Sequence, residues 1–316
     1  MDEQYAGTVS RRDAVKWGLL AGLAGAVVRG AGGAAAPPGA VITKSIPATG
    51  ERLPVIGIGT NSFSESALAE LRNVLARFSA LGAMMIDTAA SYGQSEQVIG
   101  KLLAELKLRD RVFLASKLTD GGGFGGQPGG RESFERSLQR LQTDHLDLLY
   151  VHNMNGTDRL IGDLQAWKQA KKLRYIGIST SNDGAHATMV EQMKKFPIDV
   201  VQVNYGLGGR DAAANVLPLA LERKIAVVAN VPLGGRGGRN LQAVQGKPLP
   251  DFAGELGCTS WAQVMLKYVV SHPAVTCVIA GSTKTTHVED NQQAGRGVLP
   301  DATQRRRIEQ YWDALG

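Results

Sequence analysis

The sequence predicts an α/β protein, a (β/α)₈ TIM barrel, and three observations lead to this fold class. Short apolar runs rich in β-branched residues recur along the chain from about residue 55. Amphipathic helical patterns fill the intervals between these runs. The runs are continuously apolar rather than alternating, which is typical of strands buried on both faces of a parallel sheet. A doubly wound open sheet is the alternative, but eight regular strand–helix units favour the barrel.

The elements follow one another in regular order. The eight expected strands lie at residues 55–59, 83–88, 112–116, 146–152, 174–179, 199–205, 226–230 and 276–281. An apolar stripe at helical spacing follows the first strand and is expected to form core rather than a cofactor site. Its members are Leu68, Leu71, Leu75 and Phe78. The longest interval, between the last two strands, contains the glycine-rich segment 234–250, which predicts a loop.

The segment before the first barrel strand predicts an N-terminal β-hairpin. Residues 42–57 read ITKSIPATGERLPVIG, with a glycine between two strand-like runs. The turn is expected at residues 48–51. A hairpin at this position is expected to plug the bottom of the barrel.

Composition fits one large globular domain and argues against nucleic-acid binding. The chain has 316 residues, 43% hydrophobic and 20% charged, with a formal net charge of +6. The basic residues are dispersed and are not interleaved with aromatic residues, as a nucleic-acid-binding face requires. The mild positive excess instead favours an anionic ligand.

Cys258 and Cys277 form neither a zinc-ligand set nor a disulfide framework, so two ordinary thiols and no metal site are expected.

The N-terminus has the three regions of a secretory signal peptide. The pair Arg11-Arg12 precedes the apolar run WGLLAGLAGAVV, and the small residues at 34–36 form a candidate cleavage site. The Ser-Arg-Arg opening resembles a twin-arginine export signal, although Ala14 stands where such signals usually have phenylalanine. The apolar run is too short to span a membrane.

These features predict a signal peptide at residues 1–36 and a single barrel domain at residues 37–316. The expected partner of the signal is the twin-arginine export machinery, and the expected location is the periplasm, or the cytoplasm if the signal is not used. No stable membrane anchor is expected.

Polar residues at the C-terminal ends of the expected strands form the candidate catalytic site, because barrel enzymes place their active residues there. Asp87 ends the second strand, and Tyr92 follows five residues later. Lys117 ends the third strand and His152 ends the fourth.

These residue types suit the protonation of a carbonyl oxygen while a hydride reaches its carbon. A free tyrosine, with a pKa of about 10, is a poor acid at neutral pH, but a lysine ammonium beside it stabilises the tyrosinate. Asp87 can neutralise the ammonium of Lys117, and His152 can hydrogen-bond a substrate oxygen. Each residue alone also has an ordinary structural interpretation, but the four together favour a catalytic site.

The chain from about residue 41 onward resembles the aldo-keto reductases. The matching segments are IGIGT, IDTAASYGQSEQVIG, ASK, LDLLYVH, RYIGIS, QVNY and AGSTKTTHVEDN. The resemblance implies that Tyr92 is the general acid and that Lys117 lowers its pKa. It further implies that Asp87 pairs with the lysine and that His152 orients the substrate.

The resemblance also implies that a nicotinamide cofactor lies across the mouth of the barrel. Gln202 matches a residue that hydrogen-bonds the nicotinamide carboxamide. Three residues, Ser282, Asp290 and Asn291, match phosphate and adenine contacts by spacing. The full set of candidate cofactor contacts is Ser179, Thr180, Asn182, Gln202, Leu233, Gly281, Ser282, Thr283, Lys284, His287, Asp290 and Asn291.

The sequence departs from the family pattern at three places. The family's asparagine after the fifth strand is either replaced by Thr180 or supplied by Asn182. The aromatic residue that stacks on the nicotinamide is missing from segment 230–234. The usual basic residues at the 2′-phosphate align with Gly281 and His287, which leaves Lys284 as the basic candidate. NADP is expected before NAD.

A glycine-rich segment follows Lys117. Residues 119–132 read TDGGGFGGQPGGRE and contain G-x-G-x-x-G at Gly121, Gly123 and Gly126. A dinucleotide-binding turn places that pattern where a helix opens, but here glycines continue to Gly130 and a proline interrupts them. We interpret the segment as a flexible loop beside the substrate site and the pattern as accidental.

The sequence as a whole predicts an NAD(P)H-dependent oxidoreductase that interconverts a small-molecule carbonyl and an alcohol, acting as a monomer. Two alternatives remain at this point. One is a non-catalytic barrel that binds the cofactor, and the other is a lyase in which Lys117 forms a Schiff base.

Overall fold

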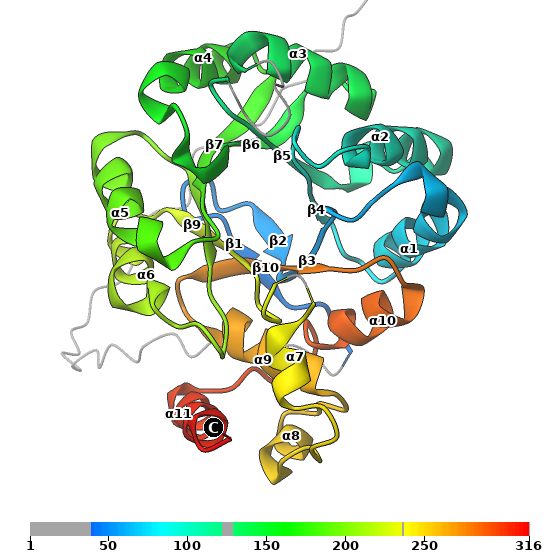
Figure 1. The fold of residues 1–316 in the computed structure, drawn as a ribbon, viewed down its shortest axis with the longest axis vertical. Helices are drawn as coiled ribbons and strands as arrows, with labels where there is room; N and C mark the ends of the chain where they lie inside the picture. The colour runs from blue at the N-terminus through cyan, green and yellow to red at the C-terminus, as the bar shows by residue number, and fades with distance from the viewer. Residues whose placement is uncertain (1–38, 122–128, 236, 316) are drawn as a thin grey trace, which may run out of the picture. The chain divides into compact units, whose positions relative to one another are not determined.

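The computed structural model describes residues 39–121, 129–235 and 237–315, and within them eight parallel strands close into a barrel (Figure 1). The strands are β3 (Ile56–Gly59), β4 (Met85–Asp87), β5 (Phe113–Leu118), β6 (Leu146–Val151), β7 (Leu173–Ser179), β8 (Val200–Asn204), β9 (Ala226–Asn230) and β10 (Val275–Gly281). Each pairs with the next along the chain, and β10 pairs with β3 to close the ring. The expected fold class and its strands are confirmed.

Helices surround the barrel (Figure 1). The main ones are α1 (Leu68–Ala80), α2 (Ser95–Leu106), α3 (Gly130–Leu141), α4 (Thr157–Gln169), α5 (His186–Lys195), α6 (Ala212–Glu222), α9 (Trp261–Ser271), α10 (Thr285–Gln293) and α11 (Ala302–Asp313). In α1, the apolar residues Leu71, Leu75 and Phe78 are buried, because their spacing places them on the face toward the sheet. This outer layer of core joins helices to strands.

Shorter elements lie in the loops. Two short helices, α7 (Arg239–Ala243) and α8 (Asp251–Glu255), interrupt the long interval after β9 that the sequence predicted to be a loop. Single 3₁₀ turns are η1 (Glu65–Ala67), η2 (Arg109–Arg111), η3 (His152–Met154) and η4 (Asp183–Ala185).

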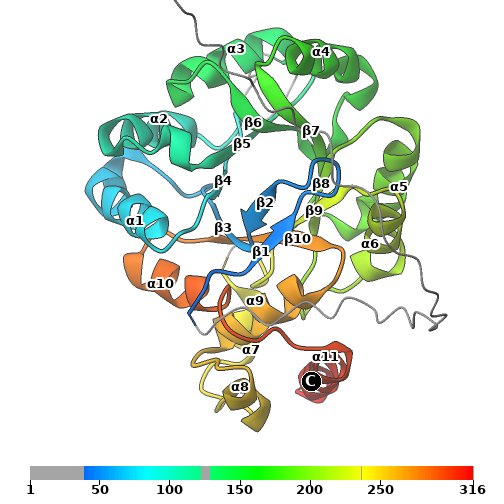
Figure 2. The same cartoon turned by 180° about the vertical axis from the view of Figure 1, so that it is seen from behind.

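The predicted hairpin is present and closes one end of the barrel (Figure 2). Strands β1 (Thr43–Ser45) and β2 (Arg52–Pro54) pair antiparallel. The side chains of Ile46 and Leu53 are buried in the same cluster as Met85, which begins β4. Lys44 Nζ donates hydrogen bonds to three main-chain carbonyls near the start of β10. The hairpin therefore plugs the end of the barrel at which the strands begin.

No helix in the described ranges is long and apolar enough to cross a membrane. The predicted signal peptide at residues 1–36 and most of the glycine-rich segment lie outside the described residues.

Candidate active site

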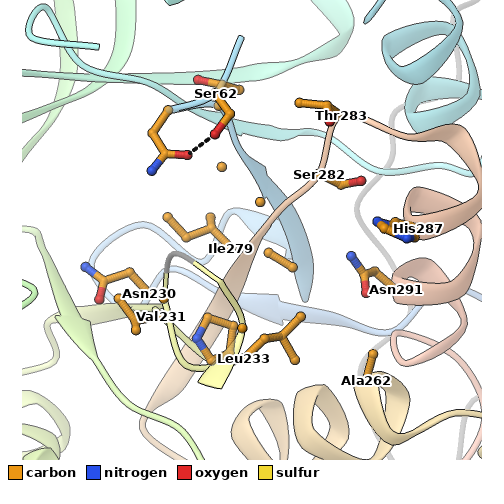
Figure 3. A pocket seen from close by; sticks show the side chains of 18 of the residues that line it. Ser62, Asn230, Val231, Leu233, Ala262, Ile279, Ser282, Thr283, His287 and Asn291 are labelled. Carbon is orange, nitrogen blue, oxygen red and sulfur yellow. Dashed lines mark hydrogen bonds between the residues drawn. The ribbon is translucent and has the colours of Figure 1, made fainter. Parts of the chain in front are cut away.

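A cavity of about 1230 Å³ opens at the end of the barrel where the strands finish. Figure 3 shows Ser282, Thr283, His287 and Asn291 along one side of it, and Asn230, Val231 and Leu233 along another. The predicted site residues that line it are Asp87, Tyr92, Gln202, Leu233, Gly281, Ser282, Thr283, His287, Asp290 and Asn291. The cavity therefore joins the predicted catalytic end to the predicted cofactor contacts.

Asp87 and Lys117 form a buried ion pair at the base of the cavity. They end neighbouring strands β4 and β5, and each side chain is almost fully buried. Lys117 Nζ donates to Asp87 Oδ2 and, over 2.8 Å, to the carbonyl oxygen of Thr88. Burial lowers the pKa of Lys117, but Asp87 and then Tyr92 outweigh burial and raise it above its ordinary value. The lysine is therefore a fixed ammonium at neutral pH.

Tyr92 lies directly beside this ammonium. Its ring centre is 5.0 Å from Lys117 Nζ. The loop that carries it is held against β5, because the Ala90 N–H donates to the Lys117 carbonyl over 3.0 Å. The Tyr92 side chain is half-buried and reaches the cavity. A fixed positive charge beside the ring can stabilise negative charge that develops on the phenol oxygen when its proton is transferred.

His152 stands next to Tyr92 and is neutral. The two ring centres are 5.8 Å apart, with an edge-on angle of 79°. The pKa of His152 is lowered to about 4, first by burial and then by the charge of Lys117. Its Nδ1 lies 3.3 Å from the hydroxyl oxygen of Ser91. If that hydroxyl donates to Nδ1, the ring carries its proton on Nε2 and can donate to a substrate oxygen.

Amide groups link the ion pair to the next strands of the barrel. Gln202 Nε2, on β8, donates to Asp87 Oδ1 over 2.7 Å. Asn230, at the end of β9, donates through Nδ2 to Gln202 Oε1 over 3.3 Å and to the Thr180 carbonyl over 2.9 Å. These bonds explain how polar groups remain buried at the centre of the barrel.

The loop and helix after β10 form the far wall of the cavity. Ser282 Oγ and the main chain of Lys284 exchange hydrogen bonds of 3.1 and 3.2 Å, which turns the chain into α10. Asp290 accepts hydrogen bonds from Ser260 Oγ over 2.7 Å and from Gln263 Nε2 over 2.6 Å. The helices α9 and α10 are thereby tied together beside the cavity.

Several predicted residues do not line the cavity. Lys117 is covered, and His152 lies beside Tyr92 rather than in the cavity wall. The others outside the cavity lining are Ser179, Thr180, Asn182 and Lys284. Ser179 and Thr180 are buried at the end of β7, whereas Asn182 is exposed and caps η4 by accepting from the Gly184 N–H over 3.0 Å.

Sequence reasoning missed several residues of the site. Asn230 ends the seventh barrel strand, so the same strand-end rule that found Asp87 points to it as well. Ser91 was within the DTAASYG segment but was not singled out. Ser260 and Trp261 line the cavity from the start of α9, and no motif in the sequence signals them.

Comparison with known proteins defines the class of this barrel. Residues 55–313 match the model of the Aldo/keto reductase family, so the chain belongs to that family.

One relative supports this assignment, and two solved structures share the fold. The chain is 30% identical over 253 residues to methylglyoxal reductase YeaE of Escherichia coli, covering 76% of this chain and 84% of that protein. Its fold is similar to that of an aldo-keto reductase from Klebsiella pneumoniae solved in complex with NADPH, with a TM-score of 0.73, 24% identity and coverage of 86% and 96% of the two chains. It is also similar to aldo-keto reductase AKR11C1 from Bacillus halodurans in its holo form, with a TM-score of 0.70, 24% identity and the same coverage.

Proposed function

We propose that the protein is an NADPH-dependent reductase that converts a small aldehyde or ketone to an alcohol, or catalyses the reverse reaction. The observation that carries this proposal is the placement of Tyr92, which lines the cavity with its ring centre 5.0 Å from the ammonium of Lys117 and 5.8 Å from the ring centre of the neutral His152. Membership of the aldo/keto reductase family supports the same chemistry.

The residues around the cavity fit a dinucleotide. The volume is adequate for a ligand of this size, and the lining combines apolar side chains with a few polar groups. The far wall includes His287, with the exposed Lys284 beside it at the start of α10. A basic group and the N-terminal end of a helix both favour a phosphate, and they would hold the additional 2′-phosphate by which NADP differs from NAD. When bound, the cofactor supplies the hydride.

The chain's own residues supply orientation and a proton. His152, neutral above pH of about 4, holds a carbonyl oxygen through Nε2–H. Tyr92 delivers the proton from its hydroxyl to that oxygen. Lys117 stabilises the phenolate that remains, and Asp87 keeps the lysine in place.

The same contacts argue against a Schiff-base lyase. An amine must be neutral to attack a carbonyl. Lys117 is fully buried, its ammonium is bound by Asp87 and Thr88, and its pKa is raised. These contacts stabilise the charged ammonium form of Lys117 over the neutral amine that Schiff-base formation requires.

The decisive experiment is turnover by residues 37–316 and by the Tyr92→Phe variant. We expect loss of NADPH absorbance with small aldehydes such as methylglyoxal, which the name of the E. coli relative suggests as a first substrate. Tyr92→Phe should lower kcat by about 10²- to 10⁴-fold, the usual contribution of a general acid, and leave NADPH affinity within about twofold. Undiminished turnover by the variant would overturn the proposal, as would a wild-type protein that does not bind NADPH.

We also propose that residues 1–36 direct export of the folded protein, carrying its cofactor, through the twin-arginine route. The paired Arg11-Arg12 and the apolar run after it support this proposal. A reporter fused after residue 36 should reach the periplasm, and Arg11→Lys/Arg12→Lys should retain it in the cytoplasm. Periplasmic reporter in the double variant would contradict the proposed route.

A further inference from the structure

Asn230 carries a buried acceptor without a donor. The residue is only 8% exposed, and it lines the cavity. Among the described residues, its Oδ1 atom has no hydrogen-bond partner. Buried side-chain oxygens in folded proteins are normally paired, so an unpaired one on a residue of the cavity wall calls for a donor from outside the protein, either a water molecule or a ligand that displaces it.

The orientation of the Asn230 amide is set by its neighbours. Both hydrogens of Nδ2 face oxygen acceptors, the carbonyl of Thr180 at 2.9 Å and Oε1 of Gln202 at 3.3 Å. Rotating the amide by half a turn would place Oδ1 against two oxygens, with no proton between them. The nitrogen is therefore committed to the protein, and the oxygen is the atom left for a ligand.

The hydrogen-bond network places this oxygen near the reacting end of the cavity. Asn230 binds Gln202, Gln202 binds Asp87, and Asp87 binds Lys117 beside Tyr92. Asn230, Gln202, Asp87 and Tyr92 all line the same cavity, so a ligand that reaches Tyr92 can extend to Asn230. Another asparagine near this edge, Asn182, is exposed and already accepts from the Gly184 N–H.

The chemistry required of the ligand is a neutral N–H or O–H donor. The carbonyl group of an aldehyde or ketone offers only an acceptor, so it does not complement Asn230 Oδ1. The primary carboxamide on a nicotinamide ring offers two N–H donors. A nicotinamide ring that delivers a hydride to a carbon beside Tyr92 would place its carboxamide in the cavity that Asn230 also lines.

We propose that Asn230 Oδ1 accepts a hydrogen bond from the carboxamide N–H of the nicotinamide ring. This inference rests on the proposed function. The side-chain amide that recognises the carboxamide is then that of Asn230, at the end of β9. Thr180, at the end of β7, contributes only its main-chain carbonyl, which orients the Asn230 amide.

The test compares ligands that differ only in this donor. NADPH has a carboxamide, whereas its 3-acetylpyridine analogue has a methyl group in place of the NH₂. Binding of each is followed by quenching of tryptophan fluorescence, since Trp261 lines the cavity. The wild-type protein should prefer NADPH by roughly 3- to 10-fold, the effect of one neutral hydrogen bond, and Asn230→Ala should reduce the preference to about one.

The ratio of the affinity for NADPH to the affinity for the acetylpyridine analogue distinguishes loss of this hydrogen bond from a general loss of binding. Asn230→Ala also removes the bonds to Thr180 and Gln202, but that loss affects both ligands. Asn204→Ala is the matched control, because Asn204 is 9% exposed on the neighbouring strand and its Oδ1 already faces His186 Nε2 at 3.1 Å. The control should keep the full preference for NADPH.

A measurement on the wild-type protein alone covers the case in which Asn230→Ala does not fold. Thionicotinamide NADPH retains the NH₂ group, so it should bind like NADPH and more tightly than the acetylpyridine analogue. Equal affinity for all three ligands would overturn the inference, and so would an unchanged preference for NADPH in Asn230→Ala. Failure of the wild type to bind any of them would instead overturn the proposed function.

Discussion

Gln202 Nε2 and Asp87 Oδ1 are joined by a hydrogen bond of 2.7 Å across the centre of the barrel. The other oxygen of Asp87 accepts from Lys117. Both oxygens of the carboxylate are therefore held, one from β5 and one from β8. The Asp87–Lys117 ion pair beside Tyr92 is therefore positioned by the Gln202 amide as well as by the attraction between opposite charges.

Replacing Gln202 by methionine should disturb catalysis through Asp87. The substitution keeps the length of the side chain but removes the donor, which leaves a buried carboxylate oxygen without its partner. We expect the free energy of unfolding to fall by about 1–3 kcal/mol and kcat to fall by roughly 10-fold, measured by urea unfolding and by NADPH turnover.

The matched control is Gln292→Met. Gln292 is 5% exposed and donates to the Ile56 carbonyl over 3.3 Å, away from Asp87. It should lose stability but keep kcat within about twofold. Equal losses of kcat in both variants would show that Gln202 has no special relation to the ion pair.

Ser91 is expected to set the tautomer of His152. Their contact of 3.3 Å leaves Nε2 protonated if the hydroxyl donates to Nδ1. Ser91→Ala should lower kcat/KM by roughly 3- to 10-fold, the effect of one neutral hydrogen bond, whereas Ser91→Thr keeps the hydroxyl and should restore most of the rate. Steady-state kinetics on one aldehyde would check this. A threonine variant as slow as the alanine variant would count against the tautomer role.

The lowered pKa of His152 predicts a loss of stability in mild acid. An unfolded histidine titrates near pH of about 6.5, but in the folded protein the pKa is about 4. Between these values the unfolded chain binds a proton that the folded protein does not, so stability falls as the pH falls through this range. The expected contribution is about 2 kcal/mol between pH of about 7 and 5.

Urea unfolding at both pH values, on the wild type and on His152→Gln, isolates this contribution. The variant should lose less stability on acidification than the wild type does. His272, whose pKa is also lowered to about 4, chiefly by burial, should behave in the same direction when replaced by glutamine. An identical pH dependence in the wild type and His152→Gln would refute the assignment.

Local patterns in the sequence were sufficient to predict the barrel. Its strands are continuous apolar runs, and their C-terminal ends fall at one rim by the topology of parallel β/α units, so Asp87, Lys117 and His152 could be placed together. The hairpin also followed from local turn chemistry, since Gly50 adopts a positive φ of 77° in its turn.

Relations between distant side chains could not be predicted in the same way. The bond between Asn230 and Gln202 joins residues on two strands, and no periodicity encodes which amide hydrogen faces which oxygen. The helices α7 and α8 have five residues each, too few to show a helical period, so the interval between β9 and β10 was predicted as a loop. The cavity is lined by Leu241 from this interval and by Ser260 and Trp261 from the start of α9.

Val231, next to Asn230, has a strained backbone. Its φ is 56°, in the left-handed region that a β-branched residue rarely adopts. The side chain is half-buried at the cavity wall. Strain of this kind persists where the surrounding structure imposes it, and it concentrates at functional sites.

Val231→Asn should therefore stabilise the protein, because asparagine tolerates this backbone conformation. We expect a gain of about 1 kcal/mol in the free energy of unfolding and a rise in Tm of about 2 °C, measured by urea and thermal unfolding without cofactor. Val298→Asn is the control, since Val298 is 54% exposed and does not have a positive φ. It should change stability by less than about 0.5 kcal/mol. A destabilised Val231→Asn would mean that the packing of the valine outweighs its backbone strain.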